Sequence, residues 1–186
     1  MTLFHSTLAT PFGPFSVATD EEGFVCCSAF GRLPALKARL PRRSRAAAEP
    51  GAVEWRPAGR RHARIRQEVR EYCAGSRPHP DVPLRPVGSS FQQRVWQALA
   101  TVPPGETRSY GQLARTLQTA PRAVGRANAT NPVCLFVPCH RIVGGTGALT
   151  GFAFGNVLKA KLLRHEAVRR AKSTQVASTS ADKVTS

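Results

Sequence analysis

Residues 131–143 read Asn-Pro-Val-Cys-Leu-Phe-Val-Pro-Cys-His-Arg-Ile-Val, a short apolar run that leads into a Pro-Cys-His-Arg turn. The apolar run 133–137 is typical of a buried strand. Cys139 follows it directly and is flanked by His140 and Arg141. Cationic neighbours lower the pKa of a thiol, and the thiolate is the form of cysteine that attacks electrophiles. Cys139 is therefore a candidate nucleophile.

One other interpretation of this pair stays open on local sequence alone, in which Cys139 packs in the core and His140 is an ordinary surface group. A free cysteine is often a small hydrophobic residue of the core. Neighbouring side chains of an extended segment also point to opposite faces, so His140 needs a sharp turn or a bridging water to act on the Cys139 sulfur. A hydrolase is disfavoured because the sequence has no Gly-x-Ser-x-Gly elbow and no cysteine-protease signature.

The surrounding segment is strongly basic. The 186-residue chain has a formal charge of +16 and a pI of about 11.3, which favours a polyanionic partner. Arginine supplies 22 of the 27 basic residues, and such a bias can also reflect nucleotide composition. Between Glu106 and Glu166, however, there is no carboxylate at all. That window predicts a positive face formed by Arg108, Arg115, Arg122, Arg126, Arg141, Lys159, Lys161 and Arg164.

Composition places the chain among globular proteins, with 41% hydrophobic and 20% charged residues. No apolar run approaches the roughly 20 residues that span a bilayer, and the N-terminus lacks the pattern of a secretory signal. We expect a soluble protein of a reducing, cytoplasmic compartment, whose five cysteines are thiols.

The N-terminal part predicts a small α/β domain over residues 1–85. Three strands are expected at 2–8, 12–18 and 24–28, forming an antiparallel sheet, and a helix at 63–74. The Pro-, Arg- and Ala-rich stretch 34–61 predicts a short helix followed by a loose basic surface segment at about 41–61 without a functional role. Four prolines between 78 and 89 indicate an extended connector, and a domain boundary falls near residue 86.

The C-terminal part, 86–170, predicts a mainly helical domain. Helices are expected from Ser89 to Pro103, from Ser109 to Leu117, and from Pro121 to the Asn131-Pro132 stop. The last two form a helix-turn-helix. A further helix is expected at about 156–169, and residues 171–186 are predicted to be a disordered tail. The overall fold class is thus α+β.

Seven segments of this domain together form a recognisable pattern. They are FQQRVWQAL at 91–99, PGETRSYGQLA at 104–114, RAVG at 122–125, NP at 131–132, PCHRIVG at 138–144, LTGF at 149–152 and LLRHE at 162–166. The pattern resembles the O(6)-alkylguanine-DNA alkyltransferases, also called methylated-DNA-protein-cysteine methyltransferases. The resemblance extends from about Phe91 to Ala167, and more weakly over the N-terminal sheet.

The resemblance implies a single-turnover DNA repair transferase that moves the alkyl group from O(6)-alkylguanine to its own cysteine, with O(4)-alkylthymine as a second candidate substrate. Cys139 is then the alkyl acceptor, His140 the water-mediated base and Glu166 the carboxylate that orients it, in the manner of a catalytic triad. Asn131 is similar to the asparagine that holds the active-site turn. The resemblance implies no cofactor, and it implies a location at the nucleoid if the protein is bacterial or in the nucleus if it is eukaryotic.

The same resemblance implies how DNA is bound. The partner is double-stranded DNA containing an alkylated guanine, which a monomer binds from the minor groove and flips out of the stack. Arg122 matches the arginine that fills the vacated space, and Tyr110 the tyrosine that helps rotate the nucleotide. Ile142 N–H and the Cys139 carbonyl are expected at the base edge, and Ala153 N–H at the guanine O(6). Further contacts are expected from Phe152, Arg126 and Arg141.

Three features depart from the family pattern. Tyr110 and Arg122 are twelve residues apart where many members have fourteen, so the helix-turn-helix should be tightened. The loop 151–155 reads Gly-Phe-Ala-Phe-Gly, which replaces a glycine by Phe154 and should narrow the rim of the pocket, so that methyl adducts fit better than benzyl adducts. Cys134 lies five residues before the acceptor and is expected to be buried packing.

Two rival functions remain. A damage-binding protein of the alkyltransferase-like kind flips alkylguanine without reacting, but such proteins replace the acceptor cysteine. A helix-turn-helix regulator would need a dimer interface and large base-reading side chains, which the stretch 121–129 does not offer. No metal is expected, because the spacing of His5, Cys26, Cys27, His62 and His79 does not match a zinc site.

Overall fold

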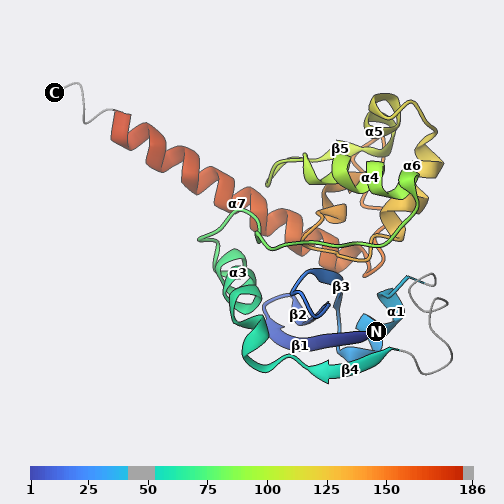
Figure 1. Ribbon diagram of the computed structural model, residues 1–186. Coiled ribbons are helices and arrows are strands. Elements are labelled where there is room, and N and C mark those ends of the chain that lie inside the picture. Colours follow the sequence, from blue (N-terminus) through green and yellow to red (C-terminus); the bar gives the residue numbers. More distant parts are fainter. Residues whose placement is uncertain (42–52, 182–186) are drawn as a thin grey trace.

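The computed structural model describes residues 1–41 and 53–181 (Figure 1). Its N-terminal part contains the three predicted strands, β1 at Thr2–Thr10, β2 at Gly13–Thr19 and β3 at Val25–Phe30. β2 pairs antiparallel with both β1 and β3. A fourth strand, β4 at Glu54–Pro57, pairs parallel to β1, and the sheet order is β3-β2-β1-β4. The predicted antiparallel sheet is therefore confirmed, and the free edge of β1 accepts β4 as an additional, parallel strand.

Short helices accompany the sheet. They are α1 at Leu33–Arg39, the 3-10 helix η1 at Gly59–His62 and α3 at Ala63–Ala74, which ends at the left-handed Gly75. Because residues 54–57 form β4 and residues 59–62 form η1, the part of the expected loose segment from 54 onward is ordered. Residues 42–52 lie outside the described residues.

Three helices of the C-terminal part occur where the sequence predicts them. They are α4 at Ser90–Ala100, α5 at Tyr110–Thr116 and α6 at Pro121–Ala129. Capping boxes start α4 and α5, because Ser89 pairs with Gln92 and Ser109 with Gln112. The turn between α5 and α6 closes tightly with Gln118 at a φ of 51°, as the shortened spacing predicts. A two-stranded ladder, β5 at Arg108–Ser109 and β6 at Ile142–Val143, ties α5 to the segment after Cys139.

The run 133–137 is buried but does not form the predicted strand. Leu135 takes a positive φ of 72°, and the segment turns so that Cys134 bridges Val137. Val133 meanwhile bridges Ser28 of β3, and the Ser28 hydroxyl donates to the Cys134 carbonyl at 2.7 Å. The run 133–137 is therefore held by contacts with β3 of the N-terminal sheet and does not form a regular strand of its own.

One hydrophobic core joins the two parts of the chain. The ring of Phe15 on β2 lies 5.9 Å from that of Phe136 in the buried turn. The connector also follows the sheet, since Val25 N–H donates to the Pro83 carbonyl and Arg85 N–H to the Val25 carbonyl. The N-terminal part therefore supports the segment that carries Cys139.

The last helix, α7, spans Asn156–Ala181 and crosses the molecule beside both parts (Figure 1). The expected disordered tail is thus helical as far as Ala181, because no glycine or proline interrupts the sequence from 156 onward. Residues 182–186 lie outside the described residues. Within the described chain, no helix is both long enough and apolar enough to cross a membrane.

Candidate active site

Cys139, His140 and Arg141 form a single 3-10 turn, η2, immediately after Pro138. All three side chains are buried, with at most 4% of their surface exposed. The turn resolves the geometric problem posed by an extended segment, since residues in a 3-10 turn do not alternate between two faces. All five cysteines of the chain are free thiols, as expected.

Glu166 on α7 holds the turn through a saturated hydrogen-bond network. Its Oε1 accepts from His140 Nε2, Arg141 Nη2 and the Tyr72 hydroxyl, each at 2.9 Å. Its Oε2 accepts from Arg141 Nε at 2.9 Å and from Gly105 N–H at 3.2 Å. Burial alone would raise the pKa of Glu166, but the bonds and charges of His140 and Arg141 outweigh it and hold that pKa well below its usual range. The carboxylate is therefore ionised.

This network assigns the proton on His140. An ionised carboxylate only accepts hydrogen bonds, so Nε2 of His140 carries the proton and Nδ1 keeps a lone pair. Burial lowers the pKa of His140 despite the opposing effect of Glu166, which keeps the ring neutral near pH 7. Nδ1 is buried and has no protein partner among the described residues. A neutral, oriented imidazole with an unused lone pair is suited to act as a base.

The expected lowering of the Cys139 pKa is wrong. Burial raises the pKa of this thiol, while a hydrogen bond with Asn131 and the positive charges of Arg39 and Lys159 oppose the rise without cancelling it. The expected cationic neighbour, Arg141, is directed at Glu166 instead. A thiol in this environment needs a base to become reactive, which gives His140 a defined task.

The predicted positive face is also smaller than expected. Arg141 and Lys159 are buried, with 2% and 0% exposed, so neither contributes to the surface. Arg141 is thus corrected from a DNA contact to a positioning residue for Glu166. The exposed members of the predicted set are Arg108, Arg115, Arg122, Arg126, Lys161 and Arg164.

Asn131 stabilises the buried turn 133–137 through two hydrogen bonds of its side chain. Its Nδ2 donates to the Val137 carbonyl at 2.9 Å, and its Oδ1 accepts from Val133 N–H at 3.0 Å. The side chain therefore spans the buried turn 133–137 that precedes Cys139. This is the geometry of a residue that holds the active-site segment in place.

Tyr110 lies at the first turn of α5, close to η2. Its hydroxyl donates to the Thr150 carbonyl at 3.2 Å and accepts from Asn128 Nδ2 at 3.3 Å. Asn128 Nδ2 also lies 3.4 Å from the Cys139 carbonyl. Arg122 and Arg126, by contrast, are exposed on α6 and make no contact with Cys139.

The loop 150–155 contacts both Tyr110, through the Thr150 carbonyl, and His140, through Phe152. Phe152 is buried with its ring 6.5 Å from that of His140, whereas Ala153 is exposed. The Ile142 N–H donates to the Cys139 carbonyl within η2, so these two groups, expected at the base edge, are bonded to each other in the structure as it stands. Phe154 lies 5.5 Å from the rings of both Phe30 and Phe152.

Sequence reasoning missed four residues of the site. Arg39 on α1 donates to the carbonyls of Ala129 and Asn131, although its segment was expected to have no function. Lys159 donates to the carbonyls of Ile142 and Thr150, and burial lowers its pKa to about 8. The others are Tyr72 and Asn128. The sequence contained a signal for Tyr72 alone: it lies on the expected buried face of the helix 63–74, where its hydroxyl needs a hydrogen-bond partner.

Comparison with known proteins agrees with this geometry. Residues 90–168 match the family model described as "6-O-methylguanine DNA methyltransferase, DNA binding domain". A methylated-DNA–protein-cysteine methyltransferase of Mycobacterium tuberculosis is 44% identical over 123 residues, covering 65% of this chain and 74% of that protein. One from Methanosarcina acetivorans is 36% identical over 166 residues, covering 88% and 98%.

Solved structures show the same fold. The crystal structure of Mycobacterium tuberculosis O6-methylguanine methyltransferase has 34% sequence identity and a TM-score of 0.73, covering 90% of this chain and 94% of that one. The structure of the enzyme from that organism in complex with DNA has 32% identity and a TM-score of 0.74, covering 91% and 94%. Fold and site together define a cysteine-dependent alkyltransferase. The chain belongs to the methylated-DNA–protein-cysteine methyltransferase family.

Proposed function

We propose that this protein repairs DNA by transferring the alkyl group of O6-alkylguanine to Sγ of Cys139. The observation that carries the proposal is the buried arrangement in which Glu166 fixes the tautomer of His140 beside Cys139. His140 takes the thiol proton through a bridging water, the S–C bond forms as the C–O bond to guanine breaks, and the leaving guanine takes up a proton. The thioether product is not regenerated, so each molecule acts once.

Burial of Cys139 requires that the target base leave the duplex. Flipping costs a few kcal/mol, which contacts elsewhere must supply. Arg122 and Arg126 are exposed on the second helix of the helix-turn-helix, where they are free to meet DNA. Arg122 fills the space left by the flipped nucleotide, Arg126 contacts the backbone, and Tyr110 lies where the base enters. Phe152, Ala153 and Ile142 line the base site.

The partner is double-stranded DNA containing an alkylated guanine, bound by a monomer in the compartment that holds the genome. Most of the binding energy comes from phosphate contacts, so affinity falls steeply with salt. Sequence preference is weak, because the exposed side chains of α6 contact backbone and fill space rather than read base edges.

The test is the mass of the intact protein after mixing with a short duplex that contains one O6-methylguanine, followed by peptide mapping. A gain of one methylene group on Cys139 that stops at one equivalent is expected, with none in Cys139→Ala. Cys73→Ala is the matched control and should react like the wild type, because the Cys73 thiol is half-buried with a pKa that burial raises to about 11. Selective binding of the damaged duplex without any mass change would instead establish a damage-binding protein.

A further inference from the structure

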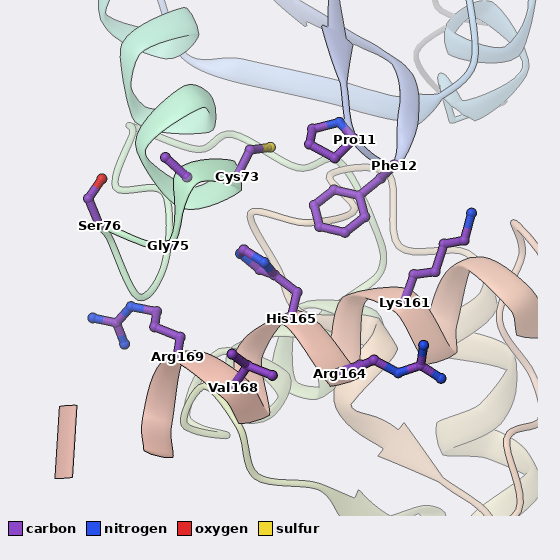
Figure 2. A pocket seen from close by; sticks show the side chains of 11 residues that line it. Pro11, Phe12, Cys73, Gly75, Ser76, Lys161, Arg164, His165, Val168 and Arg169 are labelled. Atoms are coloured by element: carbon purple, nitrogen blue, oxygen red, sulfur yellow. The ribbon is translucent and has the colours of Figure 1, made fainter. Parts of the chain in front are cut away.

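A cavity separate from the Cys139 site opens between the β1–β2 turn, the end of α3 and α7. Its volume is about 680 Å³, within the range of small-molecule pockets. Figure 2 shows side chains of all three elements around it, with Phe12 and Cys73 on one side and Lys161, Arg164, His165 and Val168 of α7 on the other.

The cavity uses a different face of α7 from the active site. Lys159, Leu162 and Glu166 are the buried residues of the described part of this helix, and they lie toward the core and η2. The cavity is lined by α7 residues 161, 164, 165, 168 and 169, a spacing that places them along one stripe of the helix. Neither set shares a residue with the other, so the cavity is a distinct site.

The lining is positively charged. Lys161, Arg164 and Arg169 contribute to it, and none of the lining residues, all of which the structure describes, is Asp or Glu. Lys161 and Arg164 are exposed and form no salt bridge within the described chain. Several cations around one concave site favour a multiply charged anion such as a phosphate over a single carboxylate.

The rest of the lining is aromatic and apolar. The rings of Phe12 and His165 lie 5.3 Å apart, edge to face, and His165 Nε2 is fixed 2.7 Å from the Tyr72 carbonyl. Val168 lies beside them with 52% of its surface exposed, which leaves apolar area for a ligand to cover. A planar ring can pack against such a wall while a phosphate attached to it meets the cations.

We propose that this cavity binds a nucleoside phosphate, with the phosphate at Lys161 and Arg164 and the base against Phe12, His165 and Val168. The site binds without reacting, because Cys73 at its edge remains protonated at neutral pH. The ligand is either a free nucleotide or the phosphorylated end of a DNA strand, which present the same chemistry to these side chains.

The probe is 2′-deoxyadenosine 5′-monophosphate, titrated into the wild-type protein by calorimetry at low salt. Deoxyadenosine and inorganic phosphate, each supplying half of the ligand, should bind about tenfold more weakly. An adenine probe is chosen because the Cys139 site is proposed to take guanine.

Two pairs of variants locate the binding. Arg164→Glu should weaken binding of the nucleotide by about tenfold, whereas Arg32→Glu, the same change at an exposed arginine beside α1, should leave it unaltered. Val168→Glu should weaken it similarly, whereas Val157→Glu changes an exposed valine of α7 outside the cavity and should not. Alkylation of Cys139 is assayed in parallel, so a failure of the transfer reaction is recognised independently.

A 5′-phosphorylated single-stranded tetranucleotide separates the two sources. Tighter binding than the mononucleotide, lost in Arg164→Glu and Val168→Glu, assigns the site to a strand end, and weaker binding assigns it to a free nucleotide. The proposal is overturned if neither probe binds, if inorganic phosphate binds as tightly as the nucleotide, or if binding survives both cavity variants.

Discussion

Arg141 and Glu166 form a two-pronged ion pair in which both side chains are almost completely removed from water. Nε and Nη2 of Arg141 each lie 2.9 Å from a different oxygen of Glu166, and the side chains are 2% and 1% exposed. The third nitrogen, Nη1, donates to the Val102 carbonyl at 2.6 Å. The pair joins η2 to α7 and thereby fixes the carboxylate that bonds His140.

Arg141→Ala should destabilise the protein strongly, because it leaves a buried carboxylate without its main partner. Removing one member of a buried pair costs about 3–5 kcal/mol in the free energy of unfolding. Urea denaturation at pH 7 measures it. The control is Arg170→Ala, which breaks a half-exposed pair with Glu106 and should cost about 1 kcal/mol or less. Equal losses in the two variants would contradict the structural role of Arg141.

The rate of alkyl transfer should change little between pH 6.5 and 8.5. Burial raises the pKa of Cys139 and lowers that of His140, so the thiol keeps its proton and the ring stays neutral across that interval. His140 takes the thiol proton within the protein, so the reacting pair needs no exchange of protons with the solvent. Single-turnover rates between pH 6.5 and 8.5, at saturating duplex, test this. A rate that rises about tenfold per pH unit would show that hydroxide, rather than His140, removes the proton.

His62 should make the stability of the protein fall in mild acid. This buried histidine bonds the hydroxyls of Ser6 and Thr19, and burial, with the charges of Arg66 and His5, lowers its pKa to about 4. Between pH 6.5 and 4 the unfolded state binds a proton that the folded state does not. The stability contributed by neutral His62 is therefore complete above pH 6.5 and declines as the pH falls toward 4, by on the order of 3 kcal/mol.

The free energy of unfolding of His62→Gln should accordingly depend less on pH than that of the wild type, when both are measured by urea denaturation at pH 4.5, 5.5 and 7. His5→Gln, at a half-buried histidine whose pKa is also lowered, serves as the comparison. If His62→Gln keeps the full pH dependence of the wild type, His62 is not its source.

Arg122→Ala should slow repair of O6-methylguanine in duplex DNA by about tenfold or more while leaving the reaction with the free base unchanged. The reason is that a free base needs no flipping. Arg126→Ala, on the same helix, should instead weaken DNA binding and reduce the salt slope by about one. Equal losses on duplex and free base in Arg122→Ala would contradict a role in flipping.

Phe154→Gly should raise the rate with O6-benzylguanine relative to O6-methylguanine by about tenfold. Phe154 packs on Phe30 and lies 5.4 Å below the Arg39 guanidinium, so it anchors the loop 151–155 to the N-terminal part. Glycine releases that anchor and allows the loop to move outward. Phe154→Leu keeps an apolar anchor and should retain the wild-type ratio; both are measured as single-turnover rates with the free bases.

Local signals in the sequence were sufficient for most of the helices. Ser89, Ser109 and Pro121 start α4, α5 and α6 through caps and fixed backbone angles that depend on near neighbours alone. The run 133–137 misled prediction, because its apolar residues fit a strand equally well and its pairing with Ser28 comes from a distant part of the chain. β4 was missed because it forms only against a distant partner strand, β1. The extension of α7 was missed although the sequence contains no stop signal after residue 169.

The sequence by itself pointed to Cys139, His140 and Glu166, because the motifs that contain them resemble those of the alkyltransferases in residue type and order. Only the tertiary structure decided what surrounds them. Whether Arg141 faces DNA or Glu166, and whether the pKa of Cys139 falls or rises, depends on burial and on partners from remote segments such as Arg39 and Tyr72. Charge and desolvation act through space, and distances in space are set by the fold rather than by the spacing of residues along the chain.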